Sequence, residues 1–200
     1  MVKEPRAGRV KTRLGREIGM TSAARWFHGQ TLDLLRRVQD QRWETLIATT
    51  PDYEGMISRC WPASIARLPQ GGQDLGARMA RLFRFLPPGP LCIIGSDIPH
   101  IERRHVAAAF RALGRHNAVF GPAMDGGYWL IGLKRRAPPP RGLFAGVRWS
   151  TPYALADTLK SVPGPTAQIA RLRDVDTLAD LAALGNRRIA RLCAPASRPR

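Results

Sequence analysis

Short apolar runs alternate with amphipathic segments along this chain, and this alternation restricts the fold more than any other feature. The strand-like runs are rich in β-branched or aromatic residues and end at proline, glycine or polar turns; they span residues 44–50, 91–95, 117–121 and 128–133. The segments with apolar residues at helical intervals span residues 21–37, 74–86, 102–113, 151–159 and 177–189. The alternation predicts a three-layer α/β/α sandwich with a mostly parallel central sheet, in which 91–95 is a fully buried parallel strand.

The length and hydrophobic content predict one domain. A chain of 200 residues with 44% hydrophobic residues can bury a core, and we assign residues 1–192 to the domain and 193–200 to a flexible basic tail. No run of about eighteen apolar residues occurs and the N-terminus lacks the apolar region of a signal peptide, so we expect a cytoplasmic protein without a membrane span. The three cysteines lie far apart and predict reduced thiols.

The net charge of +17 is the extreme value in the composition. It predicts attraction to polyanions, including nonspecific binding, but the cations are scattered rather than gathered in one tract. A solvated basic surface and a site for phosphate-rich ligands both remain open. A nucleic-acid-binding module is a remote alternative, because Tyr128 and Trp129 lie inside an apolar strand and not among basic residues.

In α/β sheets, ligands bind at the carboxyl ends of the strands, so the polar residues that follow each run are the candidate site. The first candidate is the basic loop, where Gly8 permits a tight turn and Lys11 and Arg13 can flank a phosphate, with Arg9 at the same mouth. A merely solvated loop is the alternative.

Single carboxylates follow the other strands. Asp97 comes just after the run 91–95 and suits either a divalent metal or an Asx turn. Asp125 lies in a glycine-rich loop that could approach a ligand or form a simple hairpin. Asp174 and Asp176 precede the last predicted helix, where capping alone explains at least one of them.

Six motifs in order resemble a known family. They are PRAGRVKTRLG, QGGQDLGARM, IGSDIPHI, GPAMDGGYWLIGL, the LF…WST run at 143–151 and DVDTLADL, and together they cover roughly residues 1 to 185. The sequence resembles a bacterial family of glycosyltransferase-A fold, uncharacterised or described as arsenosugar-biosynthesis-type glycosyltransferases. It resembles 2-phospholactate and molybdenum-cofactor guanylyltransferases more distantly.

The resemblance implies a site for a nucleotide-diphosphate sugar. The basic loop would hold the diphosphate, and the QGGQDLG segment would approach the base or ribose. The implied nucleotide-binding residues are Pro5, Gly8, Arg9, Lys11, Arg13, Gln70, Gly72, Asp74, Gly76 and Ser96.

The resemblance also implies roles for the other strand ends. Asp97 would bind Mg²⁺ or Mn²⁺, with Asp176 and Asp174 as second-rank ligands, and Asp125 would act as a base or hold sugar hydroxyls. Lys11 and Arg13 would share the charge of the leaving group. A small-molecule acceptor would lie against Gly126, Gly127, Tyr128, Trp149, Ser150 and Thr151.

The favoured reaction is therefore metal-dependent transfer of a sugar from a nucleotide-diphosphate sugar to an acceptor hydroxyl. The alternative is nucleotidyl transfer, in which a nucleoside triphosphate joins a phosphorylated small molecule and releases pyrophosphate. Members of the family have a complete apolar first strand, whereas this sequence starts at its last turn. We therefore expect the natural protein to begin several residues before Met1.

Overall fold

The computed structural model describes residues 1–184. Its strands are β1 (Val2–Lys3), β2 (Ile47–Thr50), β3 (Arg67–Pro69), β4 (Leu91–Ile94), β5 (Ala118–Pro122), β6 (Tyr128–Leu133) and β7 (Thr166–Gln168). Its helices are α1 (Thr12–Ile18), α2 (Met20–Val38), α3 (Asp52–Ile57), α4 (Leu75–Phe85), α5 (Arg103–Leu113), α6 (Ala154–Ser161) and α7 (Leu178–Ala183). The predicted α/β class is confirmed.

The strands form two sheets. The first is parallel with the order β1-β2-β3, and the second is mixed with the order β4-β6-β5-β7. Within the second sheet, β6 is antiparallel to both β4 and β5, while β7 is parallel to β5. The run that becomes β4 was expected to be a parallel strand, and its pairing with β6 corrects that prediction. A continuous apolar run indicates burial but does not encode strand direction.

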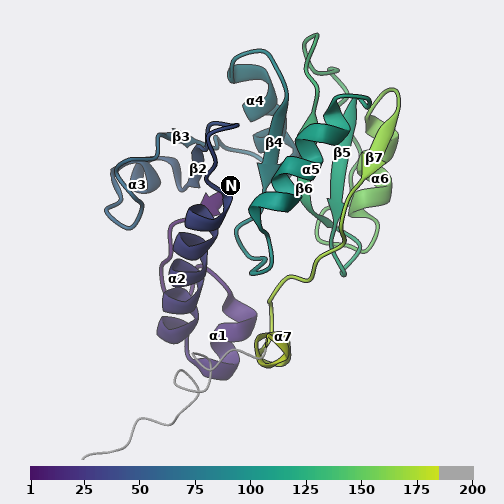
Figure 1. The fold of residues 1–200 in the computed structure, drawn as a ribbon. Helices are drawn as coiled ribbons and strands as arrows, with labels where there is room; N and C mark the ends of the chain where they lie inside the picture. The colour runs from purple at the N-terminus through teal and green to yellow at the C-terminus, as the bar shows by residue number, and fades with distance from the viewer. Residues whose placement is uncertain (185–200) are drawn as a thin grey trace, which may run out of the picture.

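The two faces of the second sheet pack against different helices. Along β5 and β6, Val119 and Leu130 point to one side and contact residues of α5 and α2. Their sequence neighbours Phe120 and Ile131 point to the other side and pack with α4 and α6. Figure 1 shows α5 lying across the front of this sheet. This produces the predicted three layers.

A separate helical cluster lies beside the basic loop. α1 and α7 lie near the end of α2 farthest from the sheets in Figure 1, and Leu14, Ala23, Val175 and Leu181 are fully buried between them. The cluster joins the two ends of the described chain, because Leu14 follows the basic loop and Val175 lies in the DVDT segment. Packing of these apolar side chains therefore brings Lys11 close to Asp176.

The facing edges of the two sheets are separated by a gap. An apolar cavity of about 130 Å³ is lined by Met1 and Val2 together with residues of β2 and β4. The Met1 ammonium donates a hydrogen bond of 2.7 Å to the Ile94 carbonyl across this gap. Burial lowers the pKa of this ammonium to about 6, although the charge of Asp97 acts in the opposite direction. The gap exists because β1, which lies between β2 and β4, is only two residues long.

Most predicted elements are present with shifted ends. The segment 128–133 coincides with β6 and 21–37 lies within α2. The predicted helix 151–159 begins later, at Ala154, because the preceding residues form turns. Four elements were not predicted: α1, α3, β3 and β7. The predicted helix 177–189 is seen as α7 up to Ala183, while its last residues, Cys193 and the tail 193–200 lie outside the described residues.

Within residues 1–184, no helix is both long and apolar enough to cross a membrane.

Candidate active site

A cavity of about 590 Å³ opens where the basic loop, the ends of β4 and β6 and the DVDT segment meet. Its walls carry groups of both charges and an aromatic surface. Most residues proposed from the sequence line it: Arg9, Lys11, Arg13, Gln70, Ser96, Asp97, Asp125, Gly127, Tyr128, Trp149, Ser150, Thr151, Asp174 and Asp176. The polar strand ends thus meet as the α/β rule predicts.

Six proposed residues do not line the cavity, namely Pro5, Gly8, Gly72, Asp74, Gly76 and Gly126. Asp74 is the N-cap of α4, where its Oδ1 accepts a hydrogen bond of 2.8 Å from the Ala77 amide. Gly8 and Gly126 have φ of +76° and +85°, so both form turns that favour glycine. Gly8, Asp74 and Gly126 thus have roles in the local backbone structure near the cavity.

Lys11 lies at the centre of the charged wall. Its Nζ donates hydrogen bonds of 3.2 Å to Asp97 Oδ2 and 2.7 Å to Asp176 Oδ1. Arg13 reaches the other oxygen of Asp176 at 3.3 Å. Burial alone would lower the pKa of Lys11, but the charge of Asp97 and the hydrogen bond to Asp176 outweigh it and the pKa is raised. Lys11 is therefore a fixed cation at neutral pH.

Local backbone contacts hold the two carboxylates in place. Val175 donates its amide to the Asp97 carbonyl at 3.4 Å, which joins the loop after β4 to the DVDT segment. Thr177 and Asp180 form a capping box at the start of α7, and the Asp180 carboxylate also accepts the Asp176 amide at 3.2 Å. The N-cap of α7 is Thr177, so the expectation that capping explains Asp174 or Asp176 is wrong.

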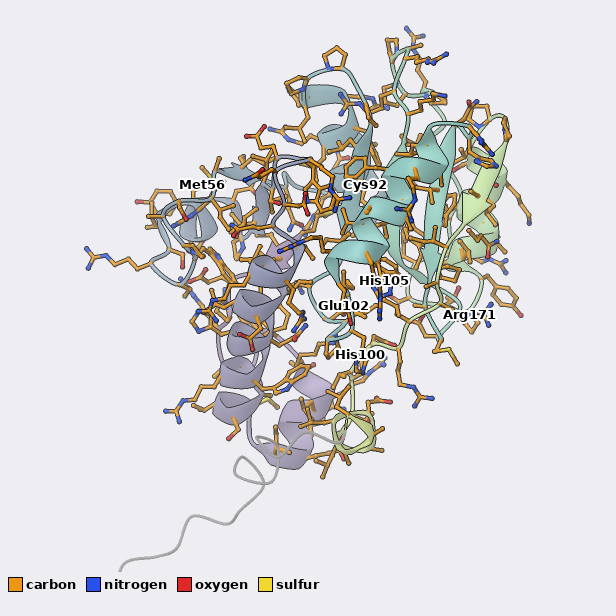
Figure 2. The ribbon with its side chains drawn as sticks, in the orientation of Figure 1. Met56, Cys92, His100, Glu102, His105 and Arg171 are labelled. Atoms are coloured by element: carbon orange, nitrogen blue, oxygen red, sulfur yellow. The ribbon has the colours of Figure 1, made fainter. Side chains whose placement is uncertain are left out.

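The start of α5 fixes the far end of the loop that carries Asp97. Glu102 is the N-cap of α5, and its amide donates to His105 Nδ1 at 3.0 Å in a second capping box. Figure 2 shows Glu102 and His105 close together at this end of α5, with His100 nearby in the loop. His100 is exposed and does not line the cavity.

Asp125 and Asp174 form a second acidic group at the rim. Asp125 Oδ1 accepts the Gly127 amide at 2.9 Å, which is the Asx turn of the glycine-rich loop, and its side chain is exposed. Burial raises the pKa of Asp174, and the charge of Asp125 raises it further, as do Asp176 and Asp97. The four carboxylates are therefore close enough to interact through the cavity.

An aromatic wall lines another part of the same cavity, through Tyr128 and Trp149. The ring of Trp149 lies 6.5 Å from that of Tyr128 and 5.9 Å from that of Phe144. Gly76 of α4 lies beneath it, since a Cβ there would come within 2.8 Å of the Trp149 ring. Burial raises the pKa of the Tyr128 hydroxyl, which stays protonated. The rings are inclined to one another by 66° and 56° and offer an apolar aromatic surface.

Gln70 has a structural role at the back of the cavity. It is 3% exposed, and its Nε2 donates to the carbonyls of Val2 and Ala48 at 2.9 Å each. These bonds hold the ends of β1 and β2 together.

The carboxylates as arranged do not fit a divalent cation. Mg²⁺ requires about six oxygen ligands, but Asp97 and Asp176 each already direct an oxygen at the Lys11 ammonium. Among residues 1–184, no group of three or more His, Cys, Asp or Glu side chains is arranged to hold a metal ion. A cation could use these carboxylates only if Lys11 moved.

Three residues of α4 line the cavity but were not predicted to do so from the sequence. Leu75, Arg78 and Met79 all line it, and their spacing of i, i+3 and i+4 places them on one face of the helix. This spacing was visible in the motif LGARM. Arg78 adds a cation, and its Nε donates to the Gln73 carbonyl at 3.2 Å.

Comparison with known proteins places the chain in a family. The family model described as "Uncharacterized protein conserved in bacteria (DUF2064)" matches residues 31–151, more than half of the chain. The chain belongs to the DUF2064 family. None of the proteins with curated descriptions matches the sequence.

A solved structure matches the fold over most of the chain. The crystal structure of a protein called "putative nucleotide-diphospho-sugar transferase" from Desulfovibrio desulfuricans G20 is 30% identical, covers 92% of this chain and 83% of its own, and superposes with a TM-score of 0.81. The predicted nucleotide-diphospho-sugar transferase fold is thereby confirmed. Rv0371c from Mycobacterium tuberculosis H37Rv is 14% identical with a TM-score of 0.45 over 79% of this chain and 82% of its own, which is too distant to inform function.

Proposed function

We propose that this DUF2064 protein is a glycosyltransferase that binds a nucleotide-diphosphate sugar in the 590 Å³ cavity. The observation that carries the proposal is the buried Lys11, which shares Asp176 with Arg13 in a cavity also lined by aromatic side chains. The fold is shared with a protein named as a nucleotide-diphospho-sugar transferase. Lys11, Arg9 and Arg13 would bind the diphosphate, with Ser96 nearby. The sugar and acceptor would lie toward Asp125 and Trp149.

The proposed reaction moves a glycosyl group to an acceptor hydroxyl. The acceptor oxygen forms a bond to the anomeric carbon as the bond from that carbon to the diphosphate oxygen breaks. Negative charge develops on the leaving diphosphate, where Lys11 and Arg13 would stabilise it. Asp125, exposed at the rim, would accept the proton of the acceptor hydroxyl or hold the hydroxyls of the sugar.

We also propose that the reaction depends on Mg²⁺ or Mn²⁺, which Asp97, Asp174 and Asp176 would bind. A bound cation would neutralise part of the diphosphate charge. Lys11 donates hydrogen bonds to two of these carboxylates. Lys11 would therefore have to move away from them before they bind the cation.

A thermal-shift panel tests the proposal. Wild type, Asp97→Ala and the control Glu44→Ala, an exposed carboxylate outside this cavity, would be heated with UDP, GDP, CDP, ADP, TDP and the triphosphates, with and without Mn²⁺. A ligand at 100 times its dissociation constant adds about 2.7 kcal/mol of stability. We expect the nucleotides of one particular base to raise Tm in wild type and in the control, but not in Asp97→Ala. No shift with any nucleotide would refute the proposal.

Product analysis separates glycosyl from nucleotidyl transfer. Release of a free nucleoside diphosphate would support the proposed reaction. Release of pyrophosphate from a triphosphate would support the nucleotidyltransferase alternative, which uses the same cations for an in-line displacement at phosphorus.

A further inference from the structure

Asp157 of α6 is a buried carboxylate outside the cavity, with 8% of its surface exposed. Such a charge needs a cation and hydrogen bonds around it. Arg148 supplies both, since its Nε donates at 2.8 Å to Oδ2, its Nη2 at 3.0 Å to Oδ1 and its backbone amide at 3.3 Å to Oδ2. The hydrogen bonds from Arg148 lower the pKa of Asp157 to about 2, so the carboxylate is ionised at neutral pH. This two-pronged pairing fixes the orientation of Arg148 as well as its distance.

The residues that follow Arg148 form part of the cavity wall. Trp149, Ser150 and Thr151 all line the cavity. The Thr151 hydroxyl donates a hydrogen bond of 2.8 Å back to the Arg148 carbonyl, which closes the turn. Because Asp157 binds both the side chain and the amide of Arg148, it fixes the start of this loop against α6.

Other residues of α6 hold two further parts of the same half of the cavity. The Thr158 hydroxyl lies 3.4 Å from the Tyr128 hydroxyl, within hydrogen-bonding distance. The Leu155 amide donates to the Gly126 carbonyl at 3.1 Å, which ties the loop that carries Asp125 to the start of α6. This one helix therefore supports each part of the cavity that we assign to the sugar and the acceptor.

We propose that Asp157 is a positioning residue for the sugar and the acceptor, which acts through Arg148 on Trp149. A residue that does not touch the substrate can do this, because a displacement of about 1 Å in a binding wall can lower a rate by about 100-fold. The assignment of sugar and acceptor to this half of the cavity rests on the proposed function. The fixing of Trp149 by Asp157 does not.

A second arginine–aspartate pair provides the matched control. Arg42 donates from Nε at 2.8 Å and from Nη2 at 2.9 Å to the two carboxylate oxygens of Asp40, and its backbone amide donates to Oδ1 at 3.0 Å. The pairing has the same pattern as that of Arg148 with Asp157, but neither Asp40 nor Arg42 lines the cavity. Asp40→Asn therefore removes an equivalent pairing away from the site.

Acrylamide quenching of tryptophan fluorescence tests whether Asp157 fixes Trp149. Wild type, Asp157→Asn and Asp40→Asn would each be measured with and without Trp149→Phe, so that the difference isolates the signal of Trp149. We expect a larger quenching constant for Trp149 in Asp157→Asn, because the freed loop exposes the ring, and no change in Asp40→Asn. An unchanged constant in Asp157→Asn, or an equal rise in Asp40→Asn, would overturn the proposal.

Arg148→Met is a second variant that keeps the proposal testable if Asp157→Asn does not fold. It removes both guanidinium hydrogen bonds from the outer side of the pair, since Arg148 is 55% exposed. It should raise the quenching constant of Trp149 as Asp157→Asn does. The double variant should add nothing further, because both changes break one pairing. Additive effects would mean that Asp157 does not act through Arg148.

Ligand affinities test the role in binding. Titration calorimetry would compare the nucleoside diphosphate that raises Tm of wild type with sugar conjugates of the same diphosphate. We expect Asp157→Asn to bind the diphosphate as wild type does, but to lose the additional affinity that the sugar provides. Equal losses for both ligands would mean general damage to the cavity and would contradict a positioning role. If wild type bound no nucleotide or nucleotide sugar, the proposed function would fail, and the quenching constants would still decide whether Asp157 fixes Trp149.

Discussion

Asp174 is an acid whose environment disfavours its charge. Burial and the neighbouring Asp125 raise its pKa in the folded protein, so the folded state resists ionisation more than the unfolded state does. A raised carboxyl pKa costs stability once the pH exceeds both pKa values and costs nothing below them. We therefore expect Asp174→Asn to raise Tm at pH 7.5.

The comparison at acid pH provides the control for this variant. At pH 4 or below, wild-type Asp174 becomes protonated and resembles asparagine, so the gain in Tm should shrink toward zero. Thermal unfolding of both proteins across this range measures the effect. An equal gain at every pH would mean that hydrogen bonding, not charge, explains it.

For single residues, the sequence predicted most of the polar side chains that line the cavity. It could not distinguish a residue that faces the cavity from one that caps a helix. Asp97 and Asp125 follow apolar runs and do line the cavity. Asp74 lies in a glycine-rich segment that the resemblance assigned to the nucleotide, but it caps α4. The pairing of Lys11 with Asp176, 165 residues away, depends on helix packing that no local pattern encodes.

Gly76 governs how α4 meets the loop that carries Trp149. A Cβ at this position would lie 2.8 Å from the Trp149 ring and 2.9 Å from Phe144 Cβ, closer than packed carbon atoms allow. We expect Gly76→Ala to displace the aromatic wall and to destabilise the protein by about 1–3 kcal/mol, as overpacking usually does. Urea unfolding measures the stability, and Trp149 quenching by an added nucleotide sugar reports the site.

Gly29→Ala is the matched control within a helix. Gly29 lies in α2 and a Cβ there would meet nothing within 4 Å. Alanine favours helix by about 0.8–1.0 kcal/mol over glycine, so this variant should be slightly stabilised. If both variants responded alike, contact with Trp149 would not explain the effect at Gly76.

Among the elements, those with clear periodicity were predicted and the short ones were not. α2 and α4 show several apolar residues at helical spacing and were located within about two residues. β3 and β7 have three residues each, too few for a pattern to emerge. α1 begins at the left-handed Lys11 without a side-chain cap, so the usual signal for a helix start is absent.

At the scale of the whole molecule, the apolar core is interrupted at the join between the two sheets. An apolar cavity of about 130 Å³ lies between residues of β2 and β4, and the Met1 amino group hydrogen-bonds across the gap to Ile94. β4 is four residues long. We expect that extending the chain before Met1 by four β-branched residues raises Tm, because the added strand fills the cavity and pairs with β4. A Gly-Ser extension of equal length should not raise Tm. Equal rises in Tm for the two extensions would contradict this explanation.

The pH dependence of stability gives an independent measure of the same join. Burial lowers the pKa of the Met1 ammonium from 8.0 to about 6, so between these values the unfolded chain holds a proton that the folded chain has released. Stability then rises with pH across this window, by about 2–3 kcal/mol in all at 1.36 kcal/mol per pKa unit. Urea unfolding at pH 6, 7 and 8 measures the slope. The chain extended by β-branched residues moves its amino group out of the gap and should lose this rise. Identical slopes in the two chains would show that the Met1 ammonium is not buried at the join.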